Sequence, residues 1–237
     1  MSPIRRIRSG RIRRLSLTAA LLAVTLLPAL AGVGQADTGG QPILGIAVSG
    51  TAAHRTSNPG AGAVQTQLVA LRYLPASALT GRWDYRTSEA LIAFQAWQGL
   101  QRDGEIGPQT LAALATAKPP TPRLKRAGAE IEIYRALGVT LLVDNGRVVR
   151  AIHSSSGKPG FTTPAGRYRV YLKSTRHWST QYHVWLPYAS FFNRGIAFHA
   201  YPDVPVYPAS HGCVRIPAPD AAQVYAFAAL GTPVVVY

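Results

Sequence analysis

The single cysteine of this chain, Cys213, ends a Ser-His-Gly-Cys tetrapeptide, and Arg215 follows two residues later. A thiol with its ordinary pKa of about 8.5 is only a few per cent thiolate at neutral pH, so a nucleophilic cysteine needs a base or a positive field. Two histidines are near enough in the sequence to serve as that base: His199, in the apolar stretch GIAFHA, and His211. Spacing alone does not choose between them, and both remain candidates.

The residues beside the thiol suit acyl-transfer chemistry. Gly212 permits close approach of the backbone, so amides near Cys213 would stabilise a carbonyl oxygen that becomes negative. Arg215 would lower the pKa of the thiol or bind a substrate carboxylate. We therefore predict that alkylation of Cys213 reaches its half-maximum below the pH expected of a free thiol.

Two other interpretations of Cys213 compete with the nucleophile. A lone cysteine often serves as a small buried apolar residue. A zinc site built from His199, His211 and Cys213 is chemically acceptable, but the sequence offers no second cysteine and no clear carboxylate at ligand spacing. The remaining histidines are predicted to be surface or structural residues: His54, His153, His177 and His183.

The elements that must position these residues are mainly strands. Residues 139–152 contain two apolar runs around Asn145-Gly146, a strong β-hairpin signal because Asn-Gly accepts positive φ. Residues 166–173 alternate in polarity and predict one strand, and residues 231–237 predict a buried final strand. Residues 217–230 predict a helix that prolines begin and a glycine ends. This half is therefore predicted to be mostly β with a late helix.

The preceding part of the chain predicts helices. Residues 86–100 place Ala90, Phe94 and Trp97 on one face of an amphipathic helix, and residues 108–117 begin a second helix at a proline. A shared spacing also predicts a small internal repeat. Its members are Gly81, Thr87, Ala90 and Leu91 in the first copy, and Gly104, Thr110, Ala113 and Leu114 in the second.

The segments outside these elements predict export and a two-part organisation. The first 14 residues carry six arginines and no acid, and an apolar run follows from Leu15 to Leu30. This order predicts a signal peptide over residues 1–36, and the run is shorter than the roughly 20 residues of a spanning helix. Residues 37–62 predict a flexible lead-in, and the proline-rich basic residues 118–127 predict a linker that spaces two domains.

The charge of the chain indicates an anionic partner. The formal net charge is +15, and the chain stays strongly basic without the arginines of the leader. Such a field favours polyanions, which for an exported protein include wall polymers and anionic lipid headgroups. Nucleic acid is not expected, because the chain lacks a basic and aromatic reader motif. With one cysteine, the chain forms no internal disulfide.

The segment FQAWQGLQRDGEIGPQTLAAL resembles the peptidoglycan-binding type 1 domain. Its hallmarks are a helix ending in Phe-Gln, a Gly-Leu turn, Asp-Gly, Gly-Pro-x-Thr and a final apolar helix. The resemblance covers residues 63–117. It implies a three-helix module that holds wall glycopeptide in a shallow groove and has no chemistry of its own.

The segment SHGCVR, preceded by FNRGIAFHA, resembles the L,D-transpeptidase catalytic domain of bacterial cell-wall enzymes, as do SSSGKPGFTTPAGRY and the final GTPVVVY. The resemblance covers residues 128–237. It implies that Cys213 is the nucleophile and that His199 accepts and donates the proton. It also implies further roles at the site: support from Ser210 and His211, an oxyanion hole formed by the amides of Gly212 and Cys213, and substrate binding by Arg215.

Two departures from the family pattern concern one loop. The gap between His199 and Ser210 is shorter than usual, and Ala200 replaces the more frequent Gly or Ser. If the residue after the histidine offers its backbone carbonyl to the imidazole, alanine serves as well. The short loop would instead alter the acceptor side of the cleft.

Chemistry and resemblance together predict a multidomain protein, with a small three-helix all-α wall-binding module followed by a mainly β L,D-transpeptidase domain. The implied reaction is a two-step acyl transfer outside the cytoplasm, without metal or cofactor, in which a thioester on Cys213 is resolved to a 3→3 cross-link. The expected partners are peptidoglycan stem peptides and glycan. The alternatives are an L,D-carboxypeptidase that uses water, and a wall-binding scaffold whose second domain is inactive.

Overall fold

The structure, a computed structural model, describes residues 59–237. The predicted signal peptide, most of the predicted lead-in and His54 lie outside these residues. The described residues all belong to one compact unit of the chain. None of the helices among them is both long enough and apolar enough to cross a membrane.

The first part of this unit is helical, as predicted. Its elements are α1 (Ala61–Ala70), the 3-10 helix η1 (Ala76–Ala78), α2 (Tyr85–Gln98) and α3 (Pro108–Thr116). α2 begins after Asp84, whose carboxylate accepts the N–H of Thr87, and it ends at Gly99 in the left-handed conformation. α3 begins with its proline in the first turn, where no N–H is needed.

The predicted internal repeat consists of two glutamine-centred turns. The side chain of Gln65 accepts the N–H of Gly81 and donates to the Thr87 hydroxyl, both at 2.9 Å. In the second copy the side chain of Gln95 likewise accepts the N–H of Gly104 at 2.9 Å, and its nitrogen lies 3.3 Å from the Thr110 hydroxyl. Both glycines have a φ of 71°, which glycine adopts without a steric penalty. Each buried amide therefore fixes the turn that leads into the next helix.

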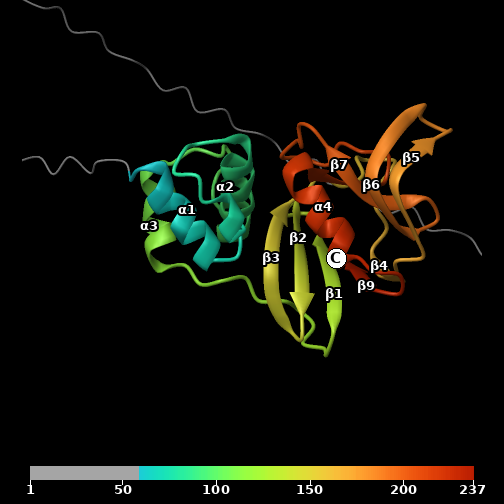
Figure 1. Cartoon of the computed structure of the whole chain (residues 1–237), viewed down its shortest axis with the longest axis horizontal. Helices are drawn as coiled ribbons and strands as arrows, with labels where there is room; N and C mark the ends of the chain where they lie inside the picture. The colour runs from blue at the N-terminus through green and yellow to red at the C-terminus, as the bar shows by residue number, and fades with distance from the viewer. Residues whose placement is uncertain (1–58) are drawn as a thin grey trace, which may run out of the picture. The chain divides into compact units, whose positions relative to one another are not determined.

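The second part contains two sheets and a late helix (Figure 1). One sheet has the order β3-β2-β1-β9-β4 and the other has the order β5-β6-β7-β8. Neighbours are antiparallel except for β1 with β9 and β7 with β8, which are parallel. The elements are β1 (Ala129–Tyr134), β2 (Val139–Asp144), β3 (Arg147–His153), β4 (Gly166–Arg169), β5 (Leu172–Ser179), β6 (Val184–Asn193), β7 (Ile196–Tyr201), β8 (Val214–Pro217), α4 (Ala218–Phe227) and β9 (Pro233–Val236).

Several predicted elements are confirmed in this part, and one is wrong. Asn145 and Gly146 both have positive φ in the β2–β3 hairpin, and β9 is buried as expected. α4 ends at Phe227, earlier than the predicted residue 230. Residues 166–173, however, are not one strand. The N–H of Val170 bonds to Thr232 beside β9, whereas the N–H of Tyr171 bonds to Phe191 on β6, so the chain changes sheet between them.

The two sheets and α4 enclose one hydrophobic core. It gathers apolar side chains from the inner faces of both sheets and from one face of the helix. Its larger members are Ile131, Ile133, Leu142, Ile152, Phe192, Phe198, Val214, Ile216 and Val224. Because β7 and β8 carry Phe198 and Val214 into this core, the residues at their ends are held firmly in place.

A second core joins the helical module to the other face of the first sheet. Leu91 and Phe94 of α2 belong to the same buried cluster as Leu141 and Val143 of β2. The edge strand β3 also donates the N–H of Ala151 to the carbonyl of Arg72 at 2.8 Å, closing part of its free edge. The prediction that the two domains are merely spaced apart is therefore wrong. Local patterns missed it because β2 is buried on both faces, by different partners.

The predicted linker is itself fixed to the sheet. The backbone N–H groups of Arg123 and Leu124 donate to the carboxylate of Glu132 on β1, at 3.0 and 2.8 Å. Pro120 and Pro122 are buried. Proline-rich composition therefore marks a stiff segment here, and its contacts with β1 limit its freedom.

Candidate active site

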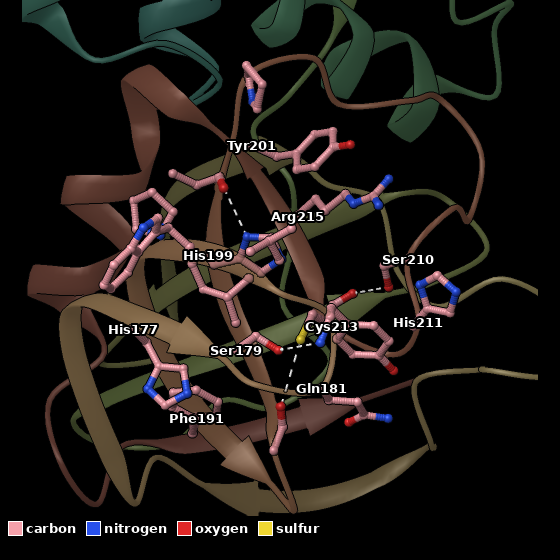
Figure 2. Close-up of a pocket in the computed structure, with 18 of the residues that line it drawn as sticks. His177, Ser179, Gln181, Phe191, His199, Tyr201, Ser210, His211, Cys213 and Arg215 are labelled. Carbon is pink, nitrogen blue, oxygen red and sulfur yellow. Dashed lines mark hydrogen bonds between the residues drawn. The ribbon is translucent and has the colours of Figure 1, made fainter.

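Cys213 lies directly before β8, at the wall of a cavity of about 810 Å³ (Figure 2). All the predicted site residues except Gly212 line this cavity: His199, Ser210, His211, Cys213 and Arg215. The thiol is partly buried, and its sulfur lies 3.8 Å from the carbonyl oxygen of Gly195 in the β6–β7 turn. The fold thus brings together residues that are separated in the sequence.

His199 reaches the cavity from β7, the parallel neighbour of β8. It pairs with Arg215 across the two strands, and Cys213 precedes that partner by two residues. Because side chains two residues apart share a face of a strand, His199 and Cys213 lie on the same face, along a diagonal of the strand pair.

The imidazole of His199 is oriented by the backbone. Its Nδ1 lies 2.9 Å from the carbonyl oxygen of Ala200, and a carbonyl can only accept, so Nδ1 carries the proton. Nε2 therefore presents its lone pair. Burial lowers the pKa of His199 to about 4, with Arg215 adding a smaller repulsive effect and the Ala200 carbonyl opposing both. His199 is thus neutral near pH 7, and alanine after the histidine provides the expected carbonyl.

The thiol of Cys213 differs from the prediction. Burial raises its pKa, while the backbone of Ala197 and the charge of Arg215 lower it less strongly. The prediction of a depressed thiol pKa is therefore wrong, because desolvation, which the buried-cysteine alternative would bring, outweighs the positive field of Arg215. A neutral thiol and a neutral imidazole therefore share the cavity, an arrangement in which the imidazole can take a proton from the thiol.

The tetrapeptide loop is stabilised by the Ser210 hydroxyl. It donates to the carbonyl of Cys213 at 2.5 Å and accepts the N–H of Gly212 at 3.0 Å. The hydroxyl thus bridges the backbone on either side of the Gly212–Cys213 peptide. This bridge also means that the Gly212 N–H is occupied in this conformation, although it was expected to contribute to an oxyanion hole. Gly212 has a φ of 121°, a conformation that side chains disfavour.

A second loop, from residue 154 to residue 163, holds the tetrapeptide from the other side. The Thr163 hydroxyl donates to the carbonyl of Gly212 at 2.7 Å and accepts the N–H of Gly157 at 3.0 Å. A side chain at Gly157 would overlap the backbone oxygen of Phe161. The sequence contained this loop in SSSGKPGFTTPAGRY, but no local pattern assigned Thr163 this bridging position.

His211 is held among aromatic rings at the cavity wall. Its ring stacks on Tyr182 at 5.0 Å between centroids and meets Phe161 edge-on at 4.7 Å. His199, in contrast, is 6% exposed and has a backbone partner that fixes its tautomer. The geometry therefore favours His199 as the base, a choice that sequence spacing left open.

The comparisons with known proteins agree with this arrangement. The family description of the L,D-transpeptidase catalytic domain matches residues 129–236, and that of a peptidoglycan binding domain matches residues 57–114. A crystal structure of an L,D-transpeptidase from Xylanimonas cellulosilytica is 36% identical and has a TM-score of 0.71, covering 76% of this chain and 93% of that one. This chain belongs to the L,D-transpeptidase family. An L,D-transpeptidase from Stackebrandtia nassauensis is 25% identical with a TM-score of 0.49, covering 75% of this chain and 90% of that one. No curated protein sequence matches this chain.

The charge in the cavity of this L,D-transpeptidase comes from Arg215. Its guanidinium lies 4.0 Å from the centroid of the Tyr201 ring, which holds it by a cation–π contact. Among the described residues that line the cavity, none is an aspartate or a glutamate. Nor do residues 59–237 contain three histidine, cysteine or acidic side chains grouped to bind a metal ion. The site can therefore attract a carboxylate from a substrate.

Proposed function

We propose that this L,D-transpeptidase is an exported enzyme that forms 3→3 peptidoglycan cross-links through a thioester on Cys213. The observation that carries the proposal is the orientation of His199, whose Nδ1 is committed to the Ala200 carbonyl. Nε2 is then the nitrogen available to take the proton of the thiol. Nucleophile and base line one cavity and reach it from neighbouring strands.

The first half-reaction acylates the enzyme. The sulfur of Cys213 attacks the carbonyl carbon at the L-centre of the diamino acid in a tetrapeptide stem, while Nε2 of His199 accepts the thiol proton. The tetrahedral intermediate then expels terminal D-alanine, and the imidazolium returns the proton to the leaving amine. A thioester remains on Cys213. The low pKa of His199 favours this return, because a weakly basic imidazole readily gives up its proton.

The second half-reaction releases the product. The side-chain amine of a second stem attacks the thioester carbonyl, and His199 takes a proton from that amine. The C–S bond breaks, the proton returns to sulfur, and the new amide links the two stems. If water attacks instead, the product is a shortened stem and the activity is that of an L,D-carboxypeptidase.

The two domains have complementary tasks in this proposal. Arg215 would bind a carboxylate of the stem in a cavity that has no acidic side chain among its described lining residues. The helical module would hold wall glycopeptide and raise the local concentration of stems without taking part in the chemistry. The basic charge of the chain would favour association with anionic wall polymers.

Mass analysis of products from purified tetrapeptide stems tests the proposal. We expect release of D-alanine and a dimer lighter than two stems by one D-alanine, together with an acyl adduct on Cys213. Cys213→Ser is expected to give neither product. Shortened monomers without dimers would indicate the carboxypeptidase, and a folded protein with no adduct would leave the wall-binding scaffold.

A further inference from the structure

One face of α2 lies against the catalytic domain and meets it with charged side chains. Oε2 of Glu89 is 2.6 Å from Nδ1 of His153, the last residue of β3. One turn earlier, Arg86 donates two hydrogen bonds to Asp220 at the start of α4. α2, in the helical module, therefore contacts two separate elements of the catalytic domain, β3 and α4.

The Glu89–His153 contact is deeply buried. The side chains are 5% and 0% exposed, so each has lost its water on folding. A buried carboxylate without a partner is strongly unfavourable, and replacing one member of such a pair leaves the other uncompensated. The imidazole of His153 is thus held in one orientation by a residue that is 64 positions away in the sequence.

His153 leads directly into the segment that supports the catalytic loop. Ser155 exchanges two backbone hydrogen bonds with Arg215, at 3.2 and 2.9 Å. The carbonyl of Ser156 accepts N–H groups from Ala209 and Ser210, at 3.0 and 3.1 Å. The N–H of Lys158 donates to the carbonyl of Ser210 at 2.9 Å. Residues 155–158 therefore form a short ladder with the residues on both sides of Cys213.

We propose that Glu89 is a positioning residue of the transpeptidase, acting through His153 on residues 154–158 and so on the loop that carries Cys213. This inference rests on the proposed function. It assigns to the helical module a task besides retention on the wall, because one of its residues fixes the end of β3. A displacement of the loop by a fraction of an ångström is expected to slow acylation, since the thiol and the substrate carbonyl must meet in a narrow range of geometries.

Arg86 provides a matched control in the same contact. It also joins α2 to the catalytic domain through a buried carboxylate. Its partner Asp220 lies at the start of α4, is held independently by Arg150 at 2.7 Å, and is outside the ladder around Cys213. Loss of Arg86 should therefore weaken the contact between the domains without moving the catalytic loop.

The test compares kcat and KM for release of D-alanine from soluble tetrapeptide stems, which removes the effect of retention on insoluble wall. We expect Glu89→Gln to lower kcat about ten-fold or more with KM within about two-fold. Arg86→Met should keep kcat within about two-fold of the parent. All variants are assayed in the full-length protein, well below the lowest Tm, with near-UV circular dichroism to verify packing.

A double variant distinguishes positioning from general destabilisation. If Glu89 acts through His153, then His153→Gln should lose about as much kcat as Glu89→Gln, and the double variant should lose no more than either. Additive losses, an unchanged kcat in Glu89→Gln, or an equal loss in Arg86→Met would each overturn the inference. A parent that releases no D-alanine would instead overturn the proposed function, and the inference with it.

Discussion

Buried polar groups have different partners in two regions of this molecule. Where the helical module meets the catalytic domain, they are paired with one another, as in Glu89 with His153 and Arg86 with Asp220. In the cavity around Cys213, His199 bonds to a backbone carbonyl through one ring nitrogen. No acidic side chain occurs among the described residues that line this cavity.

The comparison shows how one chain uses burial for two purposes. Mutual pairing compensates the loss of water at the domain contact and fixes the geometry of the two parts. In the cavity, desolvation is left partly uncompensated, so it lowers the pKa of His199 and raises that of Cys213. Both groups are then neutral, which suits the proposed roles of His199 as base and Cys213 as nucleophile.

Deleting residues 59–117 should produce the largest effect, because it removes one side of the domain contact. Leu141 and Val143, which share a core with α2, would face water. We expect the remaining catalytic domain to lose its cooperative thermal transition and its turnover of soluble stems, as measured by calorimetry and D-alanine release. The opposite result, a cooperatively folded fragment with parental turnover, would show that the contact serves retention alone.

Replacing His199 and His211 one at a time should distinguish the proposed base from a residue that only lines the cavity. His199→Ala is expected to lower the rate of Cys213 acylation by about 10²–10⁴-fold, because it removes the Nε2 that the Ala200 carbonyl leaves free to take the proton. His211→Ala should cost about ten-fold or less, through loss of its stacking on Tyr182. Rapid-mixing acylation of both variants measures the difference. Equal rates for His199→Ala and the parent would refute the assignment of the base.

The smallest expected effect is a shift in the pH dependence of Cys213. Since burial raises the thiol pKa, alkylation by a small neutral reagent should reach half-maximum above the ordinary value of about 8.5. Acylation by stems should instead stay level from neutral pH down to about 5, because His199 remains neutral until its pKa of about 4 is approached. Mass spectrometry of samples quenched at fixed times across a pH series measures the rates of both alkylation and acylation.

The lowered pKa of His199 also makes the stability of the fold depend on pH. The unfolded chain binds a proton on His199 near pH 6.5, whereas the folded chain resists it until about pH 4. This contribution to stability is therefore complete above about pH 6.5 and is lost as the pH falls toward 4.

For the alkylation of Cys213, a midpoint below 8.5 would contradict the prediction and would show that the charge of Arg215 outweighs desolvation at the thiol.

Local chemistry in the sequence predicted the parts of the fold that depend on neighbours along the chain. Asn145-Gly146 needs only its own backbone preference to form a hairpin turn, and Pro108 needs only a helix start. The nucleophile segment was equally visible, because Ser210 and Cys213 interact within one loop. The interpretation of Cys213 as a nucleophile remains a proposal.

The parts that sequence patterns missed depend on partners far along the chain. Nothing near Glu89 or His153 indicates that they meet, and His153 was expected to be an ordinary structural or surface residue. The thiol pKa was missed for a related reason, since desolvation comes from the whole fold around Cys213 whereas Arg215 is visible two residues away. Sequence spacing reports nearby charges well and burial poorly.

Deamidation of either central glutamine would break the turn that this residue fixes in the helical module. Gln95 donates its amide hydrogens to the carboxylate of Asp103 at 2.7 Å and to the carbonyl of Glu105 at 3.0 Å. Deamidation would replace this donor with a carboxylate facing two acceptors, and the turn would open through repulsion. Gln65 has the same dependence on the carbonyl of Arg82 at 2.9 Å. Because both amides are almost fully buried, water reaches them rarely, and the module is protected from this form of ageing as long as it stays folded.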